Sequence, residues 1–407
     1  MLFVRFLQDR KAGVAPLLAL AIVPLFGAVG AAVDYSRASS VRAAMQGALD
    51  ATALTLSKDS QVAQSVLLQS AADKFKANLN RPDAQNIQVT AQMAAVSGGT
   101  SLTMSASATI KTEFVGLMGY STLALSVNSA VATVSDGLGC VLSLAPTASS
   151  ALKAQGTTSV DLTNCSLYDN SNNATALTAG GSTKVSALSV GVVGGISGAD
   201  NIITTQGIRT GIAPLADPYA DVAVPNFATC DNQNFTAKST MTIDPGVYCG
   251  GIGVNAGAEL TLNPGIYYLD GGDLSVNGGA TLQGNGVTLV FTKKNRNSWA
   301  NATINGNAII NLTPPISGPT AGIVVFADRN TPVGTTFKFD GGASQYLGGA
   351  IYIPTGDITF SGGAGTSTSC TQIIGFTVTF VGNSNLAINC SSYKTKPFSS
   401  TVVKVIM

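Results

Sequence analysis

The chain of 407 residues contains no histidine. Histidine is the usual general base near neutral pH and the commonest metal ligand in proteins. Its absence excludes Ser-His-Asp and Cys-His catalysis and every zinc site that needs an imidazole. Acid–base chemistry would depend on carboxylates, lysine or tyrosine.

Charge is also scarce. Charged residues make up 11 % of the chain, against about 25 % in an average soluble domain. Lys+Arg 22 and Asp+Glu 21 leave a formal net charge of +1. A chain with so little net charge has no long-range field to attract nucleic acid, so we expect no nucleic-acid partner. Glycine is abundant instead, with 45 residues, as in exported β-rich proteins.

Motifs for nucleotide or calcium binding are missing. The sequence has no P-loop, no Rossmann fingerprint and no tandem GGxGxD repeat. The candidate catalytic carboxylates of the Gly-rich region are sparse, and several sit beside glycine, where aspartate favours turns. These candidates are Glu259, Asp270, Asp273, Asp340 and Asp357. We therefore predict no catalytic residue, no metal, no cofactor and no enzymatic activity. A β-helix carbohydrate-active enzyme that uses these carboxylates is the least favoured alternative.

An uncharged apolar run stands near the N-terminus, at Ala12–Val33. As a helix it would rise about 1.5 Å per residue and cross a hydrocarbon core of about 30 Å. We predict a retained single-pass anchor; a cleaved signal peptide is the alternative. Arg5, Arg10 and Lys11 precede the run and favour a cytoplasmic N-terminus.

Six cysteines follow the apolar run, and none forms a CxxC pair. An even number of cysteines in an exported protein indicates disulfides. We expect sequential pairing because each pair is close in sequence, whereas buried free thiols in a cytosolic protein are the alternative. The candidates are Cys140 with Cys165, Cys230 with Cys249, and Cys370 with Cys390.

Two helices are predicted after the apolar run, over 34–58 and about 60–79. Apolar residues recur at three- or four-residue intervals along the first helix and form a stripe. This stripe either packs on its own domain or contacts a partner helix. The candidate assembly contacts are Val41, Met45, Leu49 and Leu56.

Residues 85–135 change to a period of two. Residues 87–91 and 102–106 alternate apolar and polar around a turn at 97–100, which predicts a hairpin. Residues 122–134 predict a third strand, and Phe114–Gly119 a short helical turn. With the preceding helices they predict a small α+β unit.

Internal repeats dominate the remainder. Val254-Asn255-Ala256-Gly257-Ala258 recurs as Val276-Asn277-Gly278-Gly279-Ala280, and Phe339-Asp340-Gly341-Gly342 recurs as Phe360-Ser361-Gly362-Gly363. A period near 20 with Gly/Asn corners predicts coils of a right-handed parallel β-helix, a solenoid. A β-sandwich is the alternative. Residues 138–235 are irregular and predict a cap or insertion, and the apolar tail after Lys394 predicts a final strand.

The predicted fold class is therefore mainly β with an N-terminal α segment. Residues 1–33 form a cytoplasmic tip and a transmembrane anchor. Residues 34–136 form a helical stem plus the small α+β unit, and residues 137–407 form the Gly/Asn-rich β-solenoid with disulfides. The basic run at 293–296 beside Trp299 predicts a solvated loop or a contact for an acidic partner or polysaccharide.

Three N-terminal motifs carry a family resemblance: the DRKAGVA entry at 9–15, the step Asp34-Tyr35-Ser36-Arg37, and the LDATAL helix at 49–54. Together they resemble the TadE/TadG-like proteins of tight-adherence (Flp) pilus assembly, and the Gly-rich remainder resembles the β-solenoid tails of some members. Two features depart from that family. No DxSxS metal site of a von Willebrand factor A domain is present, and Leu18 stands where a prepilin has glutamate.

The resemblance implies a single-pass inner-membrane protein of a bacterium, with its bulk periplasmic or extracellular. It also implies a role in assembling or anchoring an adhesive type IV pilus through contacts with other pilus-assembly or pilus-subunit proteins. The alternative from another class is a surface adhesin or stalk whose β domain binds glycan or a host surface.

Overall fold

The structure is a computed structural model that describes residues 14–57, 64–96, 99–162, 164–342, 345–362, 370–386 and 390–406. The chain divides into two compact units. Unit 1 comprises Met1–Ser135 and Thr401–Met407, and unit 2 comprises Asp136–Ser400. The second unit is thus inserted between two segments of the first. Basic residues 5, 10 and 11, expected to flank the anchor, lie outside the described residues.

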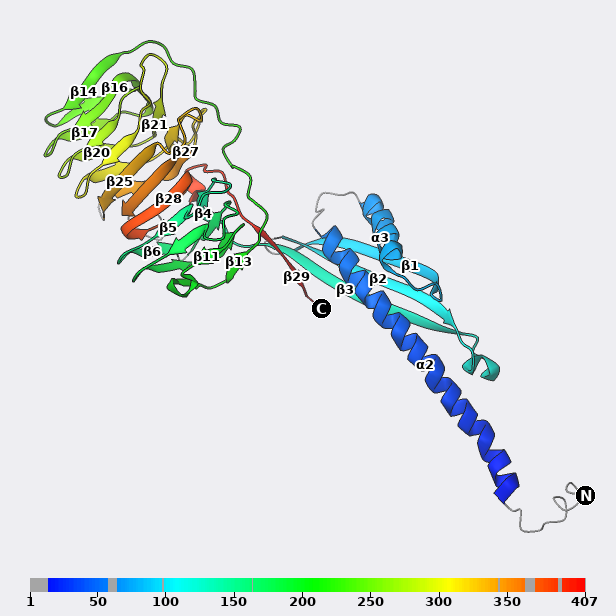
Figure 1. Cartoon of the computed structure of the whole chain (residues 1–407). Coiled ribbons are helices and arrows are strands. Elements are labelled where there is room, and N and C mark those ends of the chain that lie inside the picture. The colour runs from blue at the N-terminus through cyan, green and yellow to red at the C-terminus, as the bar shows by residue number, and fades with distance from the viewer. Residues whose placement is uncertain are drawn as a thin grey trace, which may run out of the picture. The chain divides into compact units, whose positions relative to one another are not determined.

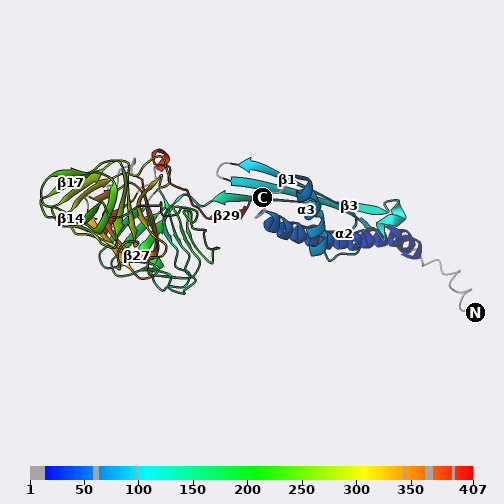
Figure 2. The ribbon, with the colours of Figure 1, turned by 90° about the horizontal axis from the view of Figure 1, so that it is seen from above.

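Unit 1 combines two helices with an antiparallel sheet (Figures 1 and 2). The helices are α2 (Val14–Leu56) and α3 (Gln64–Asn78). The sheet has the order β1-β2-β3-β29, from β1 (Gln85–Val96), β2 (Gly99–Lys111), β3 (Thr122–Ser135) and β29 (Thr401–Val405). A short 3-10 helix, η1 (Val115–Met118), lies between β2 and β3.

Alternation in the strands explains how this unit is built. Along β2, Leu102, Met104 and Ala106 are buried while the residues between them point away. A period of two gives one apolar face, and α2 and α3 cover it in a shared core. The predicted hairpin, third strand and helical turn are confirmed. The tail also forms a strand, but it pairs with β3 of unit 1 rather than with the Gly-rich region.

Unit 2 is a parallel β-solenoid, so the β-sandwich alternative is wrong for this region. Each coil contributes short strands that stack in parallel on the next coil. One run of coils contains β14 (Asn232–Ala237), β15 (Met241–Ile243), β16 (Gly246–Val254), β17 (Glu259–Leu262), β18 (Gly265–Asp270), β19 (Leu274–Val276), β20 (Thr281–Gly284), β21 (Val287–Thr292), β22 (Ala302–Ile304), β23 (Ile309–Leu312), β24 (Ile323–Ala327), β25 (Thr336–Gly342), β26 (Gln345–Leu347), β27 (Gly349–Gly362) and β28 (Thr371–Asn385).

A second run of coils comes from residues 139–210, the segment in which the sequence predicts a cap or insertion. That prediction is wrong for these residues, because they form regular coils with the same parallel pairing. The strands are β4 (Gly139–Ser143), β5 (Leu152–Ala154), β6 (Ser159–Leu162), β7 (Ser166–Asp169), β8 (Leu177–Ala179), β9 (Lys184–Ala187), β10 (Val190–Val192), β11 (Ile196–Ser197), β12 (Ile202–Thr204) and β13 (Ile208–Thr210), with the 3-10 turn η2 (Ala199–Asn201) before β12.

The order of coils in space differs from their order in the chain. The last coil of the first run, β28, pairs in parallel with β4, the first strand of the second run. The stack therefore reads 232–385 followed by 139–210. An inner ladder of buried side chains crosses this joint without interruption: Val254, Val276, Ile304, Phe339, Phe360, Phe380, Ala154 and Ala179.

Residues 211–231 return the chain from one end of this stack to the other, and we call them the strap. Leu215 hydrogen-bonds Asn170 after β7, and Tyr219 donates to Gln372 of β28 at 2.9 Å. Farther along, Phe227 stacks on Tyr268 of β18. The strap thus passes the coils in the reverse of their stacking order.

Candidate functional site: the apolar half of α2 and its loop

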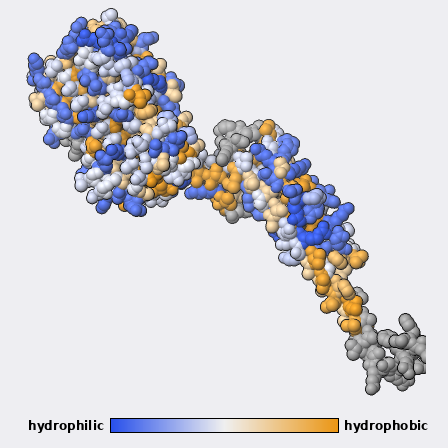
Figure 3. All heavy atoms as spheres, in the orientation of Figure 1, coloured by the Kyte–Doolittle hydropathy of each residue, from blue (hydrophilic) through white to orange (hydrophobic). Residues whose placement is uncertain are grey.

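Helix α2 has two halves with opposite surroundings. From Val14 to Val33 every residue is apolar, Gly or Pro, and the large side chains that the structure describes there face outward, with Leu20 78 % and Phe26 67 % exposed. We call Val14–Val33 the apolar helix half. Figure 3 shows apolar atoms gathered along this part of the helix. A helix that is hydrophobic all round is normally buried in protein or in a membrane.

The predicted assembly contacts lie on the other half of the helix. Val41, Met45 and Leu49 have no exposed surface, and Leu56 is 2 % exposed. All four belong to the core that α2 shares with α3 and the sheet. The stripe therefore packs on its own domain, which is the other option that the sequence left open. These side chains offer no surface to a partner in this fold.

A loop from the sheet docks on α2 where the two halves meet. Asp34 is buried, and its carboxylate accepts hydrogen bonds from the backbone N–H of Glu113 at 3.0 Å, Phe114 at 2.9 Å and Val115 at 2.8 Å. These donors stand at the start of η1, where backbone N–H groups lack helical partners. The carboxylate satisfies them and so fixes residues 112–121, which we call the η1 loop.

Two glycines of α2 form the seat of this loop. A Cβ atom at Gly30 would lie 2.4 Å from the Cβ of Phe114, and one at Gly27 would lie 2.9 Å from Cε of Met118. Gly27, Gly30 and Asp34 are spaced so that they share one helix face. A small residue is therefore needed at Gly30 for the chain's own loop to approach, whereas at Gly27 the flexible end of Met118 can shift.

The outer side of the η1 loop is apolar. Leu117 is 88 % exposed, Tyr120 68 % and Met118 63 %, and Phe114 is about half-exposed. Sequence reasoning predicted the helical turn here but missed the surface. The sequence does contain a signal for this surface, because four large apolar or aromatic residues lie within one short loop.

The cysteines lie in unit 2 and are all paired. Three disulfides join Cys140 to Cys165, Cys230 to Cys249, and Cys370 to Cys390, which are the sequential pairs that the sequence favours. Cys230 stands at the end of the strap, so its bridge ties the strap to β16.

The carboxylates of the Gly-rich region act as hydrogen-bond acceptors within the fold. Asp270 accepts from the backbone N–H of Lys294 at 2.7 Å and of Asn295 at 2.8 Å. Asp273 accepts from the backbone N–H of Asn301, Asp357 from the hydroxyl of Thr377, and Glu259 from the side-chain amide of Gln283. Asp340 is the exception: its Oδ1 is buried without a hydrogen-bond partner among the described residues, and burial raises the pKa of its carboxyl. Within the described ranges no three His, Cys, Asp or Glu residues gather as a metal site would require.

The basic run at 293–296 holds the strap. Lys294 donates to the carbonyl of Phe227 and lies 4.7 Å above its ring. Lys293 lies 5.8 Å from the Trp299 ring. The sequence predicts a solvated loop or a contact for a partner at this run. In the structure Lys294 contacts the strap of the same chain.

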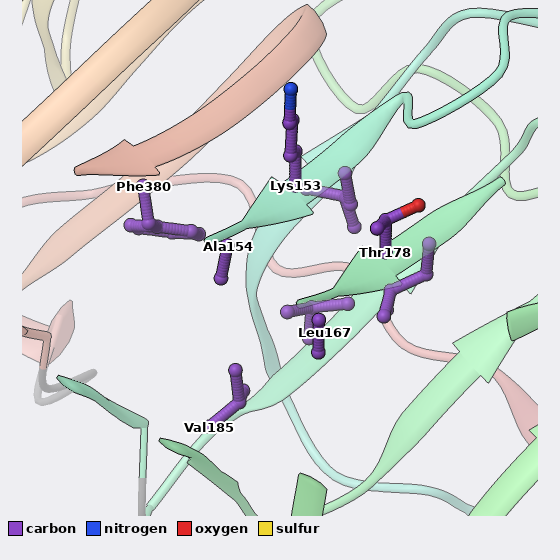
Figure 4. A pocket seen from close by; sticks show the side chains of 9 residues that line it. Lys153, Ala154, Leu167, Thr178, Val185 and Phe380 are labelled. Atoms are coloured by element: carbon purple, nitrogen blue, oxygen red, sulfur yellow. The ribbon is translucent and has the colours of Figure 1, made fainter. Parts of the chain in front are cut away.

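A cavity of about 10 Å³ lies beside the joint of the two runs, lined by Phe380, Ala154, Leu167 and Val185 (Figure 4). It could hold about one water molecule at most, and its lining is apolar. It is a packing gap and offers no ligand site.

Fold and surface together define a mainly β protein with one N-terminal helix that could be a membrane anchor. Among the residues that the structure describes, the helical segment Leu20–Leu56 is long and apolar enough to cross a membrane. Residues 13–55 match the family described as "Putative Flp pilus-assembly TadE/G-like". The match confirms the resemblance carried by the N-terminal motifs and associates the chain with Flp pilus assembly. No curated protein and no solved structure matches the chain.

Proposed function

We propose that this chain is a non-enzymatic, membrane-anchored protein that acts in assembling or anchoring a Flp pilus. The apolar helix half crosses the inner membrane once, with the N-terminus in the cytoplasm. Unit 2 and the part of unit 1 that follows Val33 lie on the far side, in the periplasm or beyond. The observation that carries the proposal is the outward-facing apolar surface of α2, because it falls within the segment that matches the pilus-assembly family.

The three disulfides support the proposed compartment. Disulfides persist in oxidising environments such as the periplasm and are rare in the cytosol. They join residues of unit 2, so the proposal places that unit outside the cytoplasm.

The proposal places the contacts with other pilus-assembly proteins on exposed surfaces of this chain. The buried residues Val41, Met45, Leu49 and Leu56 serve to hold unit 1 together. The apolar helix half remains available, because large side chains such as Leu20, Leu25 and Phe26 are mostly exposed. A helix of a partner within the bilayer is the kind of surface it fits.

Anchoring is tested first by extracting membranes with alkaline carbonate. The full chain is expected to remain in the membrane pellet. Leu25→Arg combined with Phe26→Arg places two charges in the apolar helix half, at a cost of about 2.5–3.5 kcal/mol each near the bilayer centre, and is expected to release the chain. Val66→Arg is the matched control, because Val66 is an exposed apolar residue of α3 and its variant should stay in the pellet.

The assembly role is tested in the host cell. Removing the chain is expected to reduce the number of Flp pili on the cell surface, and restoring it should recover them. The Leu25→Arg/Phe26→Arg variant should fail to restore pili, whereas Val66→Arg should succeed. Unchanged piliation without the chain would refute the role in assembly, and a cytosolic chain with reduced thiols would refute the anchoring.

A further inference from the structure

The η1 loop exposes apolar side chains at the end of a helix that is itself apolar. Loop tips of soluble proteins are usually polar, yet Leu117, Met118 and Tyr120 of this loop are mostly exposed. Phe114 and Met118 rest on Gly30 and Gly27 of the apolar helix half. The exposed surfaces of the loop and of the helix are therefore continuous.

From these contacts we propose that the η1 loop lies in the interfacial layer of the membrane, with Leu117 and Met118 in contact with lipid. The inference rests on the proposed anchoring of the apolar helix half. It assigns a second membrane-binding element to this chain, in addition to the helix. The occupant is a lipid surface, for three reasons taken in turn below.

The first reason is the position of the loop along the helix. The uncharged run ends at Val33, and Asp34 is the first charged residue after it. The loop covers α2 from Gly27 to Asp34, which spans about 10 Å along the helix axis. If the uncharged run fills the hydrocarbon core, this stretch is the outermost part of the run, beginning at the headgroups and reaching about 10 Å into the core.

The second reason is that the carboxylate of Asp34 and the backbone N–H groups of the loop are hydrogen-bonded to each other. Unpaired N–H groups and an unpaired carboxylate are costly in a layer poor in water. Here one carboxylate accepts from three successive backbone N–H groups, those of Glu113, Phe114 and Val115. The loop can therefore enter such a layer without leaving these polar groups unpaired.

The third reason is the set of residues around the loop. Tyr35 is 75 % exposed on α2, and Tyr120 is exposed on the loop. Tyrosine is enriched at membrane interfaces, where its ring is buried and its hydroxyl meets water. Arg37 lies two residues after Tyr35 and pairs with Glu113 of the loop, and Lys111 directly precedes the loop. Lysine and arginine side chains at such positions extend toward lipid headgroups.

The test uses the full chain in vesicles of phosphatidylethanolamine and phosphatidylglycerol that carry bromine on the acyl chains. Trp299, the only tryptophan, is replaced by Phe so that one probe reports at a time. Leu117→Trp is expected to lose fluorescence strongly with bromine near the headgroups and less with bromine near the chain ends. Val96→Trp is the matched control, because Val96 is exposed at the opposite end of the β1–β2 hairpin, about 40 Å from Lys111 along β2.

The outcomes separate the inference from the function on which it rests. Quenching of the Leu117→Trp probe by shallow bromine, without quenching of Val96→Trp, supports the inference. A chain that stays in the vesicles while its Leu117→Trp probe is quenched only by aqueous acrylamide overturns it. A probe that neither quencher reaches is covered by protein, and this also overturns it. A chain that does not enter vesicles refutes the anchoring proposed above.

Substituting Asp34 provides a second test, which distinguishes a loop held at the membrane by Asp34 from a loop that is only exposed. Asp34 is a positioning residue, because it fixes the loop through backbone N–H groups. Asp34→Ala in the Leu117→Trp background should leave the chain in the vesicles and remove the preference for shallow over deep bromine. The same shallow preference with and without Asp34 would show that the carboxylate does not place the loop.

Discussion

At the scale of single residues, polar groups in this chain are used mainly to hold backbone. Asp34 joins the η1 loop to α2, and Asp270 joins a loop to β18 by the same device of one carboxylate and successive backbone N–H groups. Hydrogen bonds to charged acceptors are stronger than those between neutral groups. With so few charges, each carboxylate in a loop contributes noticeably to the local structure.

Asp169 is a residue for which burial decides the chemistry. It has no exposed surface at the end of β7, and burial raises the pKa of its carboxyl from 3.8 to about 6. The folded state therefore holds this proton more tightly than the unfolded state. The resulting stabilisation is present below about pH 4 and is lost as the pH rises through 6.

Asp169→Asn is expected to abolish the loss of stability that accompanies ionisation of Asp169, since asparagine cannot ionise. The free energy of unfolding of the variant relative to the wild type should rise between pH 4 and pH 6, by up to about 3 kcal/mol. Thermal unfolding at pH 4, 5, 6 and 7 measures the difference. Asp200→Asn, at an exposed position in η2, is the control and should show no such change. A difference between Asp169→Asn and wild type that does not vary with pH would contradict the burial argument.

At the scale of elements, the strap is the least expected part of the fold. It has three prolines, Pro214, Pro218 and Pro225, which suit an extended segment without its own ladder. Its contacts are made one by one with successive coils. Arg329 donates to the carbonyl of Val222 at 2.6 Å, to that of Tyr219, and to the hydroxyl of Tyr352 at 2.6 Å.

Arg329→Met is expected to destabilise unit 2 by about 2–3 kcal/mol, because it leaves these acceptors without their charged donor. Protease cleavage within 211–231 should become faster. Lys396→Met is the matched control, because Lys396 pairs with Asp221 of the strap at an exposed position, where an ion pair contributes little. Equal effects of the two variants on unfolding and on cleavage would show that Arg329 has no special part in holding the strap.

The sequence predicted elements better than it predicted their partners. The repeats at Val254 and Val276, and at Phe339 and Phe360, do pair across neighbouring coils. The sequence also repeats Pro245-Gly246-Val247-Tyr248 as Pro264-Gly265-Ile266-Tyr267. These two segments do not pair residue for residue, since Gly246 pairs with Tyr267 instead of Gly265. A shift of two residues preserves the alternation of inward and outward side chains, so the pattern alone could not reveal it.

At the scale of the whole molecule, the two runs of coils in unit 2 meet through β28 and β4, which are far apart in sequence. The ends of the unit are neighbours, because the N–H of Asp136 donates to the carbonyl of Ser400 at 2.9 Å. The stack would become continuous in sequence if the chain ran from 229 to 400 and then, through a short linker, from 136 to 210. Residues 211–228 would be omitted, while Cys230 would be kept.

This permuted unit 2 is expected to fold, because every coil keeps its neighbours and loses only the strap. It should form the same three disulfides and show a β-rich circular dichroism spectrum, with a midpoint of thermal unfolding below that of the native order. Residues 229–400 alone are the control and should aggregate, because the paired edge of β28 is uncovered. A permuted chain that does not fold, or that is no more soluble than residues 229–400 alone, would contradict the stacking of β4 on β28.

The sequence by itself determined the features that neighbouring residues encode. These are the uncharged run at 12–33, the hairpin in 85–106, the coil period near 20 and the short separation of the cysteines within each pair. Only the tertiary structure decided that β28 stacks on β4, that β29 joins β3, that the stripe from Val41 to Leu56 is buried, and that Asp34 holds the η1 loop. The physical reason is that periodicity is local, whereas every coil presents a similar apolar interior and a similar strand edge. Which surfaces pair is therefore set by the free energy of the whole assembly of coils.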